Sequence, residues 1–205
     1  VAKLRRDPGL ASGHTAAYLN ADIDGERLDD RGMVDLLMNF LILGSETTPM
    51  VCAGSLYYLE KHPGQRAAVL ADHGLVQRLF LETARYDQPT NMLCRRAVRD
   101  FTLNGAAIKA GHNLLYIYAS ANRDGEEFER PDEFDIFRSH ARDLSYGAGG
   151  HKCLGMHLAT MGGVIVLQEF LESVRANRRP AIDAEAGFAN VRTAQRIVDA
   201  IKRTM

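Results

Sequence analysis

One cysteine of this 205-residue chain is placed where a thiol can become a metal ligand. Cys153 lies in the stretch 145–155, which reads SYGAGGHKCLG, directly before a long apolar run that predicts a helix. A thiolate rather than a thiol binds metal, and the positive end of a helix stabilises a thiolate. The glycines of the stretch allow tight turns and a close approach to a flat cofactor. The stretch therefore predicts a metal site, although most lone cysteines are simply buried thiols.

An acid and a hydroxyl interrupt a second apolar run. Residues 30–43 predict a helix that is apolar on nearly all sides and therefore central to the fold. The insert at 44–49, GSETTP, places Glu46 beside Thr47. Pro49 has no amide hydrogen and its ring crowds the preceding turn, so we expect the helix to open or kink there. The insert then exposes the acid and the hydroxyl to a ligand, unless it is a harmless solvent-facing turn.

A charged pair, Glu82 and Arg85, lies three residues apart on a helix predicted at 75–86, so both side chains share one face. An exposed pair of this kind contributes only about 0.3–0.5 kcal/mol to stability. Taken alone, the pair indicates a solvated surface.

Together these features resemble the cytochromes P-450, the haem-thiolate monooxygenases. The cysteine stretch matches the family's haem-binding loop, FGxGxHxCxG, except that Tyr146 stands for Phe. The insert matches the pattern A/G-G-x-D/E-T-T except at Leu43, a bulky residue where the family has Ala or Gly. The family also carries an ExxR pair between these two motifs, where it supports the cysteine loop. The pair and a later R-x-A-x-x-D segment at 95–100 give four motifs in the family's order, which makes the match strong.

The resemblance implies a role for each matched residue. Cys153 would be the axial ligand of haem b, Glu46 and Thr47 would relay protons during catalysis, and Glu82 and Arg85 would be a structural pair. Further residues would contact the haem, two of them through its propionates: Arg95 (with Arg96 as the rival candidate), His151, Tyr146, Gly147, Gly155 and Gly44. The substrate pocket would be lined by Leu43, Thr90, Asn91, Met92 and Leu93.

One position departs from the family in a way that matters for the charged pair. Many members have an arginine at the position of Glu133, where it completes a triad with ExxR. In this chain the triad is either incomplete or uses Arg130 or Arg138.

The activity implied by the resemblance is insertion of one oxygen atom of O2 into an apolar small molecule. Electrons would come from a ferredoxin or flavoprotein docking near Lys152. Thiolate ligation favours O–O cleavage, which is the protein's influence on the cofactor. Two alternatives remain: a truncated haem-binding remnant without turnover, and a helical scaffold with no cofactor.

The expected fold is mainly α with small β-sheets, corresponding to the C-terminal half of the cytochrome P-450 fold. The family is about twice as long as this chain, so residues 1–205 are expected to form a single partial domain. Asn104-Gly105 predicts a hairpin turn within a strand-like region at 90–118. The end of the chain is ambiguous, because helical spacing at Ala194, Ile197, Val198 and Ile201 competes with the family's terminal hairpin.

Composition excludes some classes of function. A net charge of -1 argues against nucleic-acid binding, which needs a basic surface. Apolar runs are interrupted, as at Asn39, Ser45 and Glu46, so we expect no membrane span. Three widely spaced cysteines without a CxxC pair favour a reducing compartment, and hence the cytoplasm.

Overall fold

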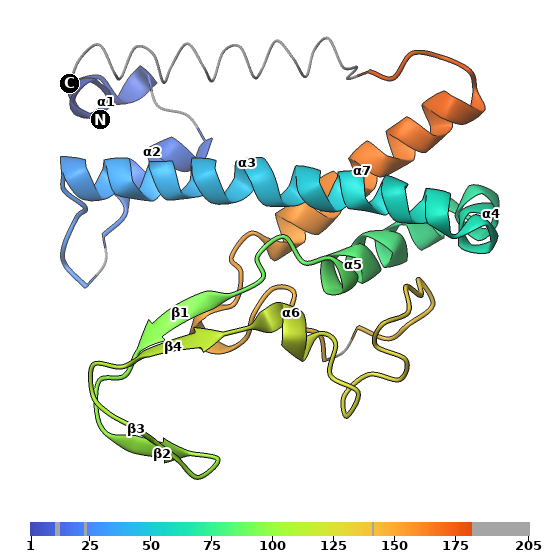
Figure 1. Ribbon diagram of the computed structural model, residues 1–205. Helices are drawn as coiled ribbons and strands as arrows, with labels where there is room; N and C mark the ends of the chain where they lie inside the picture. The colour runs from blue at the N-terminus through green and yellow to red at the C-terminus, as the bar shows by residue number, and fades with distance from the viewer. Residues whose placement is uncertain (11–12, 23, 141, 182–205) are drawn as a thin grey trace, which may run out of the picture.

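The computed structural model describes residues 1–10, 13–22, 24–140 and 142–181, so the ambiguous segment at 194–201 lies outside the described residues. The described residues form a mainly helical structure with two small antiparallel sheets, as expected from the sequence (Figure 1). The α-helices are α1 Ala2–Arg6, α2 Gly13–Asn20, α3 Asp30–Lys61, α4 Pro63–Ala71, α5 Val76–Tyr86, α6 Tyr118–Ala121 and α7 Met156–Arg175. Short 3-10 turns lie at Pro8–Leu10, His73–Leu75 and Gly149–His151.

Helix α3 is one continuous helix, so the break expected at residues 44–49 does not occur. The side chain of Asp29 caps its start by accepting a hydrogen bond from the Gly32 amide at 2.7 Å. Pro49 removes one backbone hydrogen bond, but the helix continues on both sides of it. The hydroxyl of Thr47 donates to the carbonyl of Leu43, four residues earlier, at 2.9 Å. This bond satisfies the Thr47 hydroxyl inside the helix, so the side chain needs no partner outside it.

The central position expected for α3 is only partly realised. Its buried residues are Met33, Val51, Ser55 and Leu59, whereas several large apolar side chains, Leu41, Ile42 and Leu43 among them, are exposed. By length and composition α3 could also cross a membrane, and only 6% of its most apolar window is buried, so the expectation of no possible span was wrong on that test. The polar residues at 39, 45 and 46 are too few to disqualify a 32-residue helix. A single such helix is weak evidence, because the core helix of a soluble protein passes the same test.

The hydrophobic core lies where α3, α5 and α7 meet, with α4 packed at one end (Figure 1). Its members come from these helices and from the irregular segment after α6: Val51, Leu59, Val69, Val76, Leu79, Phe80, Ala84, Phe134, Ile136, Leu167 and Leu171. Close helix packing also buries a hydrogen bond between the hydroxyls of Ser55 and Thr83, at 3.0 Å. The core therefore packs α3, α5 and α7 against one another.

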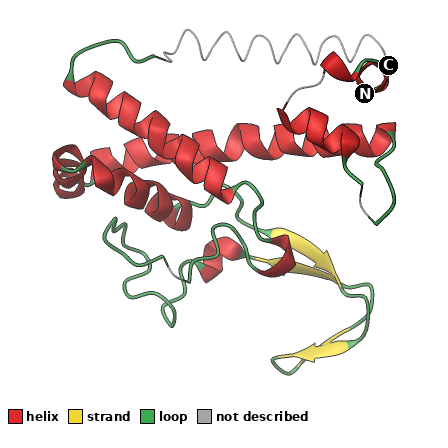
Figure 2. Cartoon of the chain, turned by 180° about the vertical axis from the view of Figure 1, so that it is seen from behind, coloured by secondary structure: helices red, strands yellow, loops and turns green. Residues whose placement is uncertain are grey.

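Two antiparallel strand pairs lie below the long helices in Figure 2, and so do the irregular stretches 122–140 and 142–145. Strand β1 Leu93–Arg96 pairs with β4 Asn113–Tyr116, and β2 Phe101–Leu103 pairs with β3 Ala106–Ile108. Asn104 and Gly105 connect β2 to β3 with φ of +46° and +82°. Both values are those of the tight hairpin turn that the sequence predicted.

The two adjacent glycines of α7 make a test of this packing. A Cβ at Gly163 would overlap the ring of Phe80, which is 1% exposed and cannot move aside, whereas a Cβ at Gly162 would meet no atom within 4 Å. We expect Gly163→Ala to lower the free energy of unfolding by about 1–3 kcal/mol. The control Gly162→Ala should be neutral or stabilising by up to about 1 kcal/mol, because alanine favours helix. Chemical denaturation of both variants measures this, and equal effects would contradict the packing described.

Candidate active site

The cysteine loop, residues 145–155, presents Cys153 as an exposed free thiol three residues before α7 begins. The Cys153 amide donates to the carbonyl of Tyr146 at 2.8 Å, which closes the loop on itself. Gly147 and Gly149 adopt φ of +67° and +68°, conformations that favour glycine. The loop therefore holds the backbone of Cys153 while leaving its sulfur accessible next to a helix N-terminus.

Tyr146, which stands where the family has Phe, adds a contact that Phe could not make. Its hydroxyl lies 3.1 Å from Oγ1 of Thr160, so the loop is bonded to the second turn of α7. Burial raises the pKa of Tyr146, and the neighbouring Cys153 raises it further. The tyrosine therefore stays neutral near pH 7 and serves as a hydrogen-bonding partner.

The other two cysteines are placed differently. Cys94 is exposed on β1. Cys52 lies on α3, with Sγ 3.9 Å from the Gly163 carbonyl, and burial raises its pKa to about 11. Burial thus favours the neutral thiol at Cys52, whereas the sulfur of Cys153 is exposed.

The predicted proton-relay residues lie on one stretch of α3. Leu43, Gly44 and Glu46 are exposed and Thr47 is half-buried. The Thr47 hydroxyl donates to its own helix, so its oxygen is left as an acceptor for a further partner.

The predicted propionate and pocket residues lie on or near β1. Arg95 is half-buried and donates from Nη1 to the Cys94 carbonyl at 2.9 Å, and within the described ranges it pairs with no carboxylate. Its rival Arg96 is exposed, as is His151 in the cysteine loop. The predicted pocket residues on this segment are exposed or half-buried, namely Thr90, Asn91, Met92 and Leu93.

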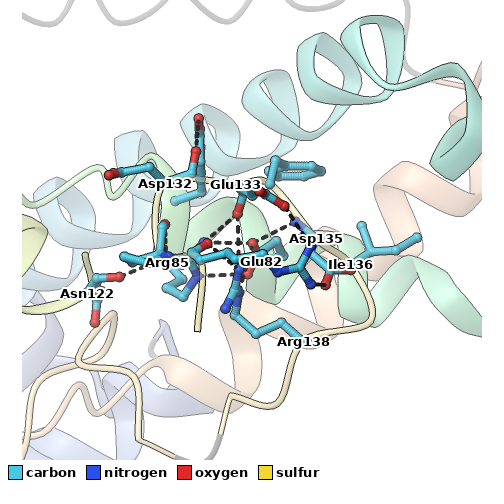
Figure 3. Close-up of polar contacts among 12 residues, drawn as sticks. Glu82, Arg85, Asn122, Asp132, Glu133, Asp135, Ile136 and Arg138 are labelled. Carbon is cyan, nitrogen blue, oxygen red and sulfur yellow. Dashed lines mark hydrogen bonds and ion pairs between the residues drawn. The ribbon is translucent and has the colours of Figure 1, made fainter. Parts of the chain in front are cut away.

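Glu82 and Arg85 are buried in the structure, although their spacing alone would indicate an exposed pair on a helix surface. Both side chains are fully buried and pair through two hydrogen bonds, Nε to Oε2 at 2.8 Å and Nη2 to Oε1 at 2.7 Å (Figure 3). The remaining donors of Arg85 bond to the carbonyls of Asn122 at 2.7 Å, Pro131 at 3.0 Å and Glu133 at 3.2 Å. All five guanidinium N–H groups are therefore used.

Arg138, not Arg130, provides the second cation for Glu82. Arg138 Nε lies 3.5 Å from Glu82 Oε1, an ion-pair contact, and its side chain is only 8% exposed (Figure 3). It also donates to the carbonyls of Arg130 at 2.9 Å and Glu133 at 3.2 Å. Arg130 instead pairs with the Glu133 carboxylate at 2.7 Å, on the exposed side. The acidic residue at 133 thus points outward, and an arginine five positions later approaches Glu82.

A histidine that sequence reasoning did not single out lies in the same cluster. His140 is 3.8 Å from Glu82 Oε2 and 3.5 Å from Asp143 Oδ2. Burial tends to raise the pKa of Asp143, but the nearby His140 and the hydrogen bond from the Ser145 amide outweigh it and lower the pKa. Asp143 therefore stays ionised at the start of the cysteine loop, where no sequence motif predicted it.

A cleft of about 590 Å³ lies between α5, the cysteine loop and α7. Its lining includes Gln77, His140, Asp143, Lys152 and His157. Two of the predicted cofactor-contacting residues, Tyr146 and Gly147, also line this cleft, whereas Cys153, Glu46 and Arg95 do not.

The available donors fit haem better than a bare metal ion. Among the described residues no group of three or more His, Cys, Asp or Glu side chains could hold a metal ion. Within the described part of the chain, a metal at Cys153 would thus have at most two such ligands and would need the rest from a cofactor. Haem brings its own metal-binding nitrogens, and Cys153 would hold it as a thiolate ligand.

Comparisons with known proteins point to one family. The family described as "Cytochrome P450" matches residues 12–183. The chain is 40% identical over 176 residues to "Putative cytochrome P450 123" of Mycobacterium tuberculosis and 36% identical over 157 residues to "Cytochrome P450-terp" of a Pseudomonas species. These matches cover 85% and 77% of this chain.

Solved structures give the same result. A post-tailoring hydroxylase of himastatin biosynthesis superposes with a TM-score of 0.78 at 33% identity, covering 83% of this chain and 46% of that one. P450BioI, solved with an acyl carrier protein carrying hexadec-9Z-enoic acid, gives 0.77 at 31% identity, covering 83% and 43%. The chain spans about two fifths of the length of the curated relatives, 43% and 37% for the two named above.

The two arginines near Glu82 allow a matched comparison. Arg138→Ala removes a buried cation from a buried carboxylate, and we expect a loss of about 3 kcal/mol in the free energy of unfolding. Arg130→Ala breaks an exposed pair with Glu133 and should cost about 1 kcal/mol or less. Equilibrium denaturation of both variants measures the difference, and a larger effect at Arg130 would mean that the cation next to Glu82 is misassigned.

Proposed function

Because the chain belongs to the cytochrome P450 family, we propose that it binds haem b through the Cys153 thiolate and takes part in monooxygenation of an apolar small molecule. Members of this family are typically haem-thiolate monooxygenases, and "Vitamin D3 dihydroxylase" of Streptomyces griseolus, 32% identical, is one relative. The proposal includes a cytoplasmic location, supported by three cysteines that are all free.

The observation that carries the proposal is the anchored cysteine loop. Cys153 combines an accessible sulfur with a backbone bonded to Tyr146 at 2.8 Å. Leu144 and Ser145, at the start of the loop, are also bonded to the Asn122 side chain. The backbone carbonyl of Asn122 accepts a hydrogen bond from Arg85. A ligand that must keep one direction towards a metal needs this kind of fixed backbone.

Each remaining residue has a role that its position supports. When bound, the haem would supply the oxygen chemistry. Thr47 would accept or pass a proton through its hydroxyl, and Glu46, exposed one residue earlier, would exchange that proton with solvent. Arg95 and His151 would bind the haem carboxylates, since both have donors not used by the described residues.

The apolar surfaces support a site larger than this chain. Leu43 on α3, Met92 and Leu93 at β1, and Leu154 and Leu158 at the start of α7 are all more than 40% exposed. Such side chains suit the faces of a porphyrin and an apolar substrate. We propose that in the whole protein further polypeptide, of the kind present in the longer relatives, closes over these surfaces, so that residues 1–205 are part of one domain.

Electrons would come from a ferredoxin or flavoprotein that docks near the exposed Lys152, beside the cysteine. A positively charged residue next to the loop suits an acidic partner.

The ferrous-CO spectrum of the haem-loaded protein tests thiolate ligation. Thiolate ligation gives a red-shifted band, and Cys153→Ser should abolish it, because a serine hydroxyl does not ionise at neutral pH. The matched control is Cys94→Ser, which removes another exposed free cysteine and should keep the band.

The outcomes separate the alternatives. A band that survives in Cys153→Ser would mean that another residue is the ligand. No red-shifted band in the unaltered protein would remove both the monooxygenase and the haem-binding remnant. A normal band without NADPH-driven oxygen consumption, with surrogate redox partners present, would favour the remnant.

The proton-relay role has its own pair of variants. Thr47→Val keeps the side-chain shape but removes the hydroxyl, so we expect product formed per O2 consumed to fall severalfold while oxygen consumption continues. Ser45→Ala removes a similar hydroxyl, bonded to the Ile42 carbonyl at 3.3 Å, and should leave that ratio unchanged. Oxygen uptake and product are measured together with surrogate redox partners; unaltered coupling in Thr47→Val would rule out the relay.

A further inference from the structure

Asn122 is a fully buried polar side chain to which the proposed mechanism gives no role. It follows α6 in the segment Ala119–Asp124 and has no exposed surface. Its Nδ2 donates to Gln88 Oε1 at 2.9 Å and to Ser145 Oγ at 3.3 Å. Its Oδ1 accepts from the Leu144 amide at 2.7 Å. The side-chain amide thus joins the end of α5 to the start of the cysteine loop.

Gln88 completes this connection from the other side. It lies two residues after α5 and is 5% exposed. Its Nε2 donates to the carbonyls of Leu144 at 3.4 Å and Ser145 at 3.3 Å. The backbone at 144–145 is therefore held through its N–H by Asn122 and through its carbonyls by Gln88.

The direction of every bond in this amide pair is fixed. The Leu144 amide can only donate, so it must face an oxygen of Asn122, and the carbonyls at 144 and 145 can only accept, so they must face the nitrogen of Gln88. Rotating either amide by 180° would place like groups against each other. Buried polar groups without a partner are costly, so this arrangement has a single stable form.

The pair also joins the buried ion pair to the metal-ligand candidate. The Asn122 carbonyl accepts from Arg85 Nη1 at 2.7 Å. At the other end, Tyr146 follows Ser145 directly, and its carbonyl accepts the Cys153 amide at 2.8 Å. Hydrogen bonds and one or two residues of chain between them therefore connect Arg85 through Asn122 to the backbone of Cys153.

We propose that Asn122, assisted by Gln88, is the positioning residue that sets the cysteine loop relative to the Glu82–Arg85 pair, and so aims Cys153 at its metal. The inference rests on the proposed function in one respect, the identity of Cys153 as the ligand. The hydrogen-bonded connection itself does not depend on haem.

Asn122→Asp is the sharpest test because it preserves shape and replaces the donating NH2 with an oxygen. The new oxygen would face Gln88 Oε1, so that bond is replaced by repulsion between two acceptors, whereas the Ser145 hydroxyl can reverse and donate to the new oxygen. Amide hydrogen exchange of the segment 144–153 should accelerate by about tenfold or more, because loss of buried hydrogen bonds makes local opening easier. After haem loading, a larger share of the ferrous-CO complex should lack the red-shifted band.

Ser55→Ala is the control for a general loss of stability. Ser55 is fully buried and bonded to Thr83, but it lies on α3 and has no bond to the cysteine loop. We expect Ser55→Ala to lower the free energy of global unfolding but to cause no additional acceleration of exchange at 144–153 and no change in the spectrum. Should Asn122→Asp fail to fold, Gln88→Ala removes the bonds to the carbonyls of Leu144 and Ser145 but keeps Asn122. This variant should accelerate exchange in the same segment.

The results distinguish failure of this inference from failure of the proposed function. Exchange at 144–153 that changes no more in Asn122→Asp or Gln88→Ala than in Ser55→Ala would overturn the positioning role, whatever the spectrum. Missing thiolate ligation in the unaltered protein would overturn the proposed function, whereas segment-specific exchange would still support the connection through Asn122.

Discussion

The buried ion pair between Glu82 and Arg85 is the interaction on which the rest of the site depends. Burying two charges is unfavourable unless every remaining donor and acceptor finds a partner. Arg85 meets that condition by donating to three backbone carbonyls outside α5, and Glu82 by accepting from the Asp135 amide at 2.9 Å and by the nearby Arg138. Satisfying these charges requires the chain after α6 to lie in one place.

This requirement explains how a segment with little regular structure can be fixed. The described residues of this segment, 122–140 and 142–145, contain no strand or α-helix, yet Phe128, Phe134 and Ile136 are buried. Arg123 adds a further contact from this segment, with its guanidinium 3.7 Å from the ring centre of Tyr86 and a bond to the Tyr86 carbonyl at 2.6 Å. Polar bonds to α5 and a few apolar anchors replace the ladder bonds of secondary structure. Asn122 of this segment bonds to Leu144 and Ser145, so the segment also positions the start of the cysteine loop.

The helical core and the predicted site surfaces differ in how far they are buried. Helices α3, α5 and α7 pack against one another in the core, whereas large apolar side chains are exposed on α3 at Leu43, at Met92 and Leu93, and near the start of α7 at Leu154 and Leu158. The family resemblance assigns haem and substrate to these surfaces. The chain spans about two fifths of the length of its curated relatives, and we propose that further polypeptide covers these surfaces in the whole protein.

The sequence by itself determined the family, the order of the elements, the hairpin at Asn104-Gly105 and the cysteine loop, because each depends on local residue types at fixed spacing. It could not determine that α3 runs unbroken through Pro49, nor that Arg138 rather than Arg130 approaches Glu82. It also gave no role to Asn122. Those features were decided only by tertiary structure. A buried charge or amide finds its hydrogen-bonding partners in segments that are distant in the chain. The spacing of residues along the sequence does not predict which of these segments come into contact.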